Sequence, residues 1–208
     1  MNDDKERQAA FMTALTTEHF VLQTAASATV SEAAARSSLY VLSLSSSLVA
    51  MGFASRSPEV FLAFAAAILP AMFLLGLFTV VRLIDTGIEN QQFLTGIARI
   101  RGYYRTLTPE AALYFSAENG RWPEVPAPPQ RFGSVVAFIT TAASMIAFIN
   151  SIVAGAGVTL LVSHVRNQAG LAWGLGVTTT LMLMIAFLAF QRWRYSLSAG
   201  TLSTHLQR

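Results

Sequence analysis

The sequence offers few side chains for catalysis or for binding a metal. Its three histidines, His19, His164 and His205, are far apart, and none belongs to an H-x-x-H or E-x-x-H pattern. There is no cysteine for a thiolate site, and no Walker loop, dinucleotide fingerprint or G-x-S-x-G sequence occurs. We therefore expect isolated surface histidines, no catalytic residue, no cofactor, no metal site and no enzymatic activity.

Hydroxyl groups and one amide are the main polar groups within the apolar parts of the chain. The candidates for lining a pore or for packing between helices are Ser43, Ser47, Thr141, Ser144, Asn150 and Ser151. Two interpretations stay open: these groups bond across helix contacts, or one such face lines a water-filled path in an oligomer. Asn150 is the most costly of them to leave facing lipid, so we expect it to meet a partner helix or water.

One basic patch could hold an anion. Arg99, Arg101 and Arg105 lie beside Tyr103 and Tyr104, and Arg101 and Arg105 are four residues apart and share a helix face. They could bind anionic lipid headgroups, a phosphate-bearing ligand or acidic residues of the N-terminal segment. A solvated or lipid-facing basic helix is the simpler interpretation. Nucleic acid is not an expected partner, because the net charge is only +3.

Four apolar blocks must position these residues. The chain has 208 residues, of which 53% are hydrophobic and 12% charged, about half the charge of a usual soluble domain. Uncharged blocks cover residues 37–54, 60–81, 133–163 and 171–190. A helix needs about 20 residues to cross the apolar part of a bilayer. The sequence therefore predicts an all-α membrane protein with four transmembrane helices in two hairpins.

The distribution of positive charge predicts the orientation. Twelve of the 14 Lys and Arg residues precede the first block, lie between the second and third, or follow the fourth; only Arg56 and Arg166 fall in the short connections. Both termini are therefore predicted to be cytoplasmic. The predicted segments are an N-terminal cytoplasmic helix (1–36), a transmembrane hairpin (37–84), cytoplasmic helices with a proline-rich linker (85–131), a second transmembrane hairpin (132–191) and a cytoplasmic tail (192–208).

Helical extensions of the first two spans are predicted from their apolar spacing. The N-terminal face consists of Phe11, Leu15, Leu22, Ala26, Val30 and Ala33, and the face after the second span of Ile84, Ile88, Leu94, Ile97, Ile100 and Tyr104. Thr108 and Pro109 form the start of a short helix that ends near Phe115. Four prolines in residues 120–131 exclude a helix there and mark a linker.

The first hairpin resembles a known kind of bacterial protein. Two spans joined by a very short turn (Ser55 to Glu59) and followed by a charged helix (Asp85 to Arg105) resemble the plan of SLATT-type membrane effectors. That resemblance covers about residues 1–118 and implies a pore triggered by a nucleotide signal in phage defence. The chain also resembles uncharacterised four-span bacterial membrane proteins. Its 13 arginines against one lysine hint at a bacterial origin, so we expect the bacterial inner membrane as its location.

Two functions are consistent with these patterns. One is a homo-oligomeric channel or pore-forming effector that is gated from the cytoplasmic side. The alternative is a non-transporting membrane scaffold or accessory subunit that binds a cytoplasmic protein through its helical extensions. The hydroxyls and the asparagine within the spans favour the channel slightly, because a scaffold by itself gives no reason to keep them.

Overall fold

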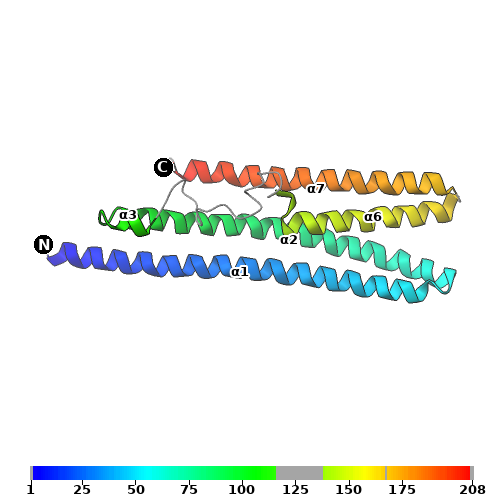
Figure 1. Cartoon of the computed structure of the whole chain (residues 1–208), viewed down its shortest axis with the longest axis horizontal. Coiled ribbons are helices and arrows are strands. Elements are labelled where there is room, and N and C mark those ends of the chain that lie inside the picture. The colour runs from blue at the N-terminus through cyan, green and yellow to red at the C-terminus, as the bar shows by residue number, and fades with distance from the viewer. Residues whose placement is uncertain (1, 116–137, 167, 207–208) are drawn as a thin grey trace. The chain divides into compact units, whose positions relative to one another are not determined.

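The computed structural model describes residues 2–115, 138–166 and 168–206, and the side chains of residues 3–115, 138–166 and 168–197. Its helices are α1 (Asn2–Ala54), α2 (Pro58–Arg105), α3 (Ala111–Tyr114), α6 (Ala142–Arg166) and α7 (Ala169–Leu206) (Figure 1). These described parts contain no strand. Four of the helices are long and apolar enough to cross a membrane. The predicted all-α membrane fold is confirmed.

A three-residue turn joins α1 to α2, as the short connection predicts. The backbone N–H of Ser55 donates to Met51 O over 3.0 Å, and that of Ser57 donates to Ala54 O over 3.1 Å. Pro58 then occupies the first position of α2, where a missing N–H costs nothing and the fixed φ suits a helix. Pro70 lies inside α2, which continues through it to Arg105.

The third apolar block does not form one helix. A turn and a bend at Thr140 and Thr141 precede α6, which begins at Ala142. The Thr141 hydroxyl accepts the backbone N–H of Ser144 over 3.2 Å, as an N-cap residue does. The helix that remains has 25 residues and is still long enough to span. The predicted start at residue 133 lies outside the described residues, as does the proline-rich linker at 120–131.

Residue contacts divide the chain into two compact units. The described parts of residues 1–32 and 86–133 form what we call the arm unit, and those of 33–85 and 134–208 form the apolar unit. Helices α1 and α2 contribute a segment to each of them.

The arm unit is an antiparallel pair of helix segments. The buried and half-buried residues of its α1 segment include a series with alternating spacings of three and four: Met12, Leu15, His19, Leu22, Ala26, Thr29 and Ala33, the last at the start of the apolar unit. This is the spacing that brings one helix face against a partner in a coiled coil. The hydroxyl of Thr29 donates to Asn90 Oδ1 over 3.1 Å, and Leu22 lies against Gly96.

The predicted α1 face is partly wrong. Val30 is 61% exposed, whereas Leu15, Leu22 and Ala26 lie on the packed side. Phe11 is 49% exposed, but its ring lies 5.4 Å from that of Tyr103 on α2, so it takes part in the contact. Val30 is one position away from the packed Thr29, and a step of one residue turns the side chain by about 100° around the helix. On α2 the prediction is better, because Ile97 and Ile100 are buried in the arm unit and Ile84 in the apolar unit.

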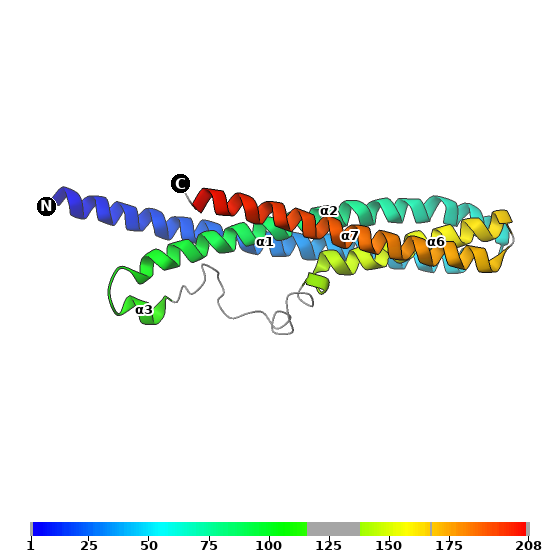
Figure 2. The same ribbon diagram turned by 90° about the horizontal axis from the view of Figure 1, so that it is seen from above.

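The predicted short helix exists but begins later. Helix α3 starts at Ala111, and Pro109 and Glu110 form a turn before it. The Thr108 hydroxyl nevertheless accepts the backbone N–H of Ala111 over 3.2 Å. Figure 2 shows α3 returning beside the end of α2, where the rings of Tyr104 and Phe115 lie 5.3 Å apart.

In the apolar unit, α6 and α7 run side by side as an antiparallel hairpin (Figures 1 and 2). Helix α7 continues without a break from Ala169 to Leu206, through most of the segment predicted as the cytoplasmic tail. The hydrophobic core of this unit includes Tyr40, Val80, Ile84, Ile146 and Phe187.

Candidate functional site

Asn150 is a fully enclosed polar residue of α6. Its side chain is 0% exposed and lies between α1 and α2. The Tyr40 hydroxyl donates to Asn150 Oδ1 over 3.3 Å, and Asn150 Nδ2 donates to the backbone oxygen of Phe73 over 3.2 Å. The expectation that Asn150 meets a partner helix is met inside the chain, by two helices.

Gly76 makes room for this contact. A Cβ atom built on Gly76 would lie 2.2 Å from Asn150 Oδ1, 2.4 Å from Asn150 Cγ and 2.8 Å from Tyr40 Cε2. Distances below about 3 Å do not occur between such atoms without displacement. Gly76 is therefore the position on α2 that lets the amide and the phenol approach its backbone.

A second polar contact joins α6 to α7. The Ser144 hydroxyl donates to Gln191 Oε1 over 3.0 Å, and Gln191 Nε2 donates to Thr141 Oγ1 over 3.1 Å. The Ser144 hydroxyl oxygen also lies 2.8 Å from the backbone oxygen of Phe138, so the two acceptors share its single proton. Gln191 is 1% exposed and Ser144 is 5% exposed. The oxygen and the nitrogen of the buried Gln191 amide therefore each have a hydrogen-bond partner within the chain.

Farther along the same helix pair, two glycines bring the backbones together. A Cβ atom on Gly155 would lie 2.6 Å from Gly176 O, and a Cβ atom on Gly176 would lie 2.7 Å from Gly155 O. Thr159 and Thr180, each four residues after one of the glycines, bond its carbonyl oxygen over 3.0 and 3.1 Å. Each helix thus carries a small-xxx-small pair, a pattern that permits close packing in membranes.

The hydroxyls of Ser47 and Ser151 bond within their own helices. The Ser47 hydroxyl donates to Ser43 O over 2.7 Å, and both residues are half-buried. Ser151 is 0% exposed and donates to Ala147 O over 2.8 Å. Of the six candidates, the four on or next to α6 are thus engaged inside the chain, and the two on α1 are partly accessible.

The three arginines of the basic patch differ in their exposure. Arg99 and Arg105 are exposed, whereas Arg101 is half-buried with its guanidinium 5.4 Å from the centre of the Phe115 ring. A cation over an aromatic face is an attractive arrangement, and here it ties α2 to the residue that follows α3. Arg101 therefore has a structural contact that its sequence spacing did not predict.

The structure describes the side chains of two of the three histidines. His164 is exposed, and the side chain of His205 lies outside the described ones. His19 differs from the expectation of a surface residue: it is half-buried, 6.4 Å from Tyr104 by ring centres, and its Nδ1 atom is buried without a hydrogen-bond partner in the described structure. The described residues hold no cluster of three metal-binding side chains.

Some residues in the contacts of the apolar unit were not predicted as site residues. Gln191 bonds Thr141 Oγ1, and Gly76 makes room for Asn150. Arg194 of α7 and Asp85 of α2 form an ion pair, and their side chains are 39% and 30% exposed. A glutamine next to Arg192 at the end of an apolar block is typical of an interfacial position, and Gly76 lies in an otherwise ordinary apolar run. The sequence around Gln191 and Gly76 does not reveal their contacts, because their partners lie on other helices.

Comparison of the chain with protein-family models, with curated proteins and with solved structures finds no match.

Proposed function

We propose that this integral membrane protein is a non-transporting scaffold or accessory subunit that binds a partner protein through its arm unit. The observation that carries the proposal is the burial of the α6 polar groups. Asn150 and Ser144 have partners on α1, α2 and α7 of the same chain, at 0% and 5% exposure. Polarity within the spans was the reason to favour a channel, and helix packing accounts for these groups without one.

The arm unit supplies the surface for a partner. Phe20 and Val21 on α1 are 63% and 55% exposed, and Leu113 and Tyr114 on α3 are 83% and 76% exposed. Single exposed apolar residues are common, but adjacent pairs of large ones on a segment outside the apolar blocks favour a protein contact. A second copy of the chain would satisfy the same surface, in agreement with the expected homo-oligomer.

The orientation belongs to the proposal. The excess of arginine before the first span, between the second and third, and after the fourth supports cytoplasmic termini in a bacterial inner membrane. The chain has no cysteine, so single cysteines can be introduced for labelling. With a membrane-impermeant maleimide and intact cells, Ser55→Cys in the turn should react and Ala14→Cys in the arm should not. The opposite pattern would reverse the orientation.

The scaffold proposal is tested by purification after mild solubilisation. We expect a partner in fixed stoichiometry with the wild type, and its loss from the Phe20→Ser/Val21→Ser variant. Ala14→Ser, an exposed change on the same helix, should retain it. Retention by the double variant, or a wild type that purifies without any partner or second copy, would contradict the proposal. So would ion flux through liposomes that contain only the purified protein.

The second candidate is the oligomeric channel, and one observation favours it. Ser45 and Ser46 of α1 are exposed, unlike the α6 hydroxyls, and could face a path between several copies. This candidate predicts flux in liposomes that changes in Ser46→Leu and not in Val49→Leu, which alters an exposed apolar residue of the same span. Equal flux in the two variants would count against it.

A further inference from the structure

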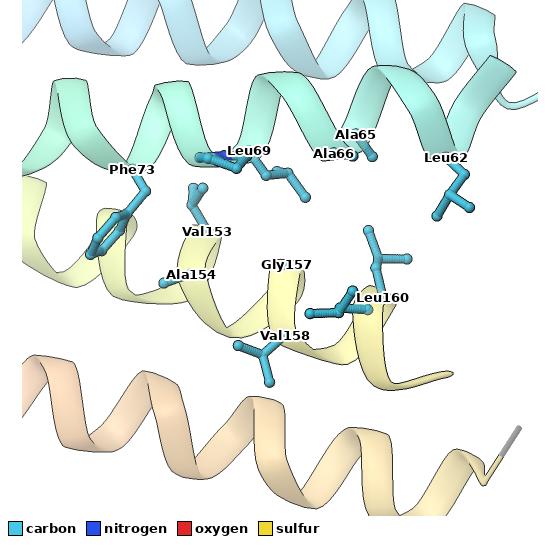
Figure 3. Close-up of a pocket in the computed structure, with 12 residues that line it drawn as sticks. Leu62, Ala65, Ala66, Leu69, Phe73, Val153, Ala154, Gly157, Val158 and Leu160 are labelled. Carbon is cyan, nitrogen blue, oxygen red and sulfur yellow. The ribbon is translucent and has the colours of Figure 1, made fainter. Parts of the chain in front are cut away.

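A cavity of about 430 Å³ lies between α2 and α6 in the apolar unit. Figure 3 shows side chains from the two helices pointing toward each other across it. Its larger lining residues are Leu62, Leu69 and Phe73 on α2 and Val153, Val158 and Leu161 on α6. Cavities of about 300–1,000 Å³ are the size at which proteins hold small ligands.

The chemistry of the wall restricts what can occupy this space. All the lining residues are apolar, and none of them has a polar side-chain atom. A water molecule would need two to four polar partners, which the lining side chains do not supply. Ala66 and Pro70 line the cavity and are exposed at the same time, so it opens to the outside of the helices. In a membrane, that outside is hydrocarbon.

Small residues keep the space open although packing does not require them. A Cβ atom on Gly157 would lie 3.8 Å from Leu69 Cδ1, which is an ordinary contact. Gly155, two residues earlier on α6, has no such room, because its Cβ would lie 2.6 Å from Gly176 O. Gly155 is therefore explained by the approach of α7, whereas Gly157 and Ala154 leave a volume that no part of the described chain fills.

The cavity extends toward the end of the unit that carries Arg56 and Arg166. Leu161 is five residues from Arg166 on α6, or about 8 Å along the helix. Leu62 lies in the first turns of α2, which begins at Pro58, and Arg56 lies in the turn just before it. Both arginines are exposed, and so is Glu59, three residues after Arg56. A phospholipid with one chain in the cavity would have its phosphate within reach of two guanidinium groups, which bind phosphate well.

We propose that this cavity is a binding site for one acyl chain of a membrane phospholipid. The site is independent of the proposed scaffold function, because it lies in the apolar unit and does not involve the arm residues.

The test uses a phosphatidylglycerol with a photoreactive diazirine on one acyl chain, in nanodiscs that hold the full chain. After irradiation, mass spectrometry should locate adducts mainly on residues 62–73 and 153–161. In Ala154→Leu/Gly157→Leu, whose new side chains fill the cavity, these adducts should be lost. Ala156→Leu is the matched control, because residue 156 is exposed on the same helix, and it should keep them.

Thermal unfolding in detergent gives a second measurement. Added phosphatidylglycerol should raise the Tm of the wild type and of Ala156→Leu, and should leave that of the filled variant unchanged. If the double variant does not fold, Ala66→Leu fills the cavity from α2 and replaces it. Adducts spread evenly over the exposed apolar residues, or adducts that persist in a folded filled variant, would overturn the proposal. Labelling of the cavity by a diazirine fatty acid and not by the phospholipid would overturn the assignment to a phospholipid.

Discussion

Gly155 of α6 and Gly176 of α7 face each other so closely that neither can carry a side chain. The Cβ atom of an alanine at either position would lie 2.6 or 2.7 Å from the carbonyl oxygen of the other glycine. The Thr180 and Thr159 hydroxyl oxygens would lie closer still, at 2.0 and 1.9 Å, and they could rotate away, whereas the backbone oxygens could not. This contact therefore sets the distance between the two helices of the second hairpin.

We predict that Gly176→Ala destabilises the protein. The methyl group would force α6 and α7 apart, and overpacking of a tight contact costs about 1–3 kcal/mol. The measurement is equilibrium unfolding in mixed micelles of increasing SDS content, followed by circular dichroism. Gly174→Ala is the matched control, because Gly174 lies on the same helix with nothing near its missing Cβ. A Gly176→Ala variant as stable as Gly174→Ala would show that the helices separate at little cost.

A second prediction concerns the bond between Tyr40 and Asn150. Removing the hydroxyl in Tyr40→Phe should cost about 0.6 kcal/mol, the average for such bonds in membrane proteins. Asn150→Leu keeps the branching of the side chain but leaves both the phenol and Phe73 O without this partner, so it should cost about 1–3 kcal/mol.

The double variant decides whether the two residues interact. If they do, Tyr40→Phe/Asn150→Leu loses less stability than the sum of the single variants, by up to about 1.7 kcal/mol. Simple additivity would mean that the 3.3 Å contact contributes nothing to the free energy of unfolding.

A third prediction separates the roles of Gln191 and Ser144. Gln191→Leu should destabilise the protein by about 1 kcal/mol, because Ser144 and Thr141 lose a bond in a buried place. Adding Ser144→Ala should restore part of the loss, since fewer polar groups are then left unpaired. Gln92→Leu, at an exposed position of α2, should have little effect in the same unfolding assay. A loss in Gln191→Leu that Ser144→Ala deepens further would argue against this network.

The four spanning helices were predictable because their signal is local. An uncharged run of about 20 residues has few other stable conformations in a membrane. The same rule does not locate the start of α6, because residues 133–163 carry no charge; in the described structure Thr141 acts as an N-cap and α6 begins at Ala142.

The polar contacts were only half predictable. The cost of an amide in lipid required that Asn150 have a partner, but nothing near it in the sequence identifies Tyr40, 110 residues away. On α1, the spacing identified Leu15 and Leu22 as packed, whereas the register against α2 decided that Val30 is exposed. Such choices depend on the partner helix, which a single sequence does not specify.

The last prediction concerns the ion pair of Asp85 and Arg194, which joins α2 to α7 at the end of the apolar unit. Both side chains are about one-third exposed, so the pair should contribute only about 0.5–1 kcal/mol. We expect Arg194→Ala to lower the free energy of unfolding by this amount and Arg192→Ala, at an exposed neighbouring position, to leave it unchanged. The difference between the two variants should shrink at high salt, because partly exposed charges are screened. The exchanged pair, Asp85→Arg/Arg194→Asp, keeps the net charge and should recover part of the stability that Arg194→Asp alone loses. If the exchanged variant is no more stable than Arg194→Asp, the two residues are close without stabilising the fold.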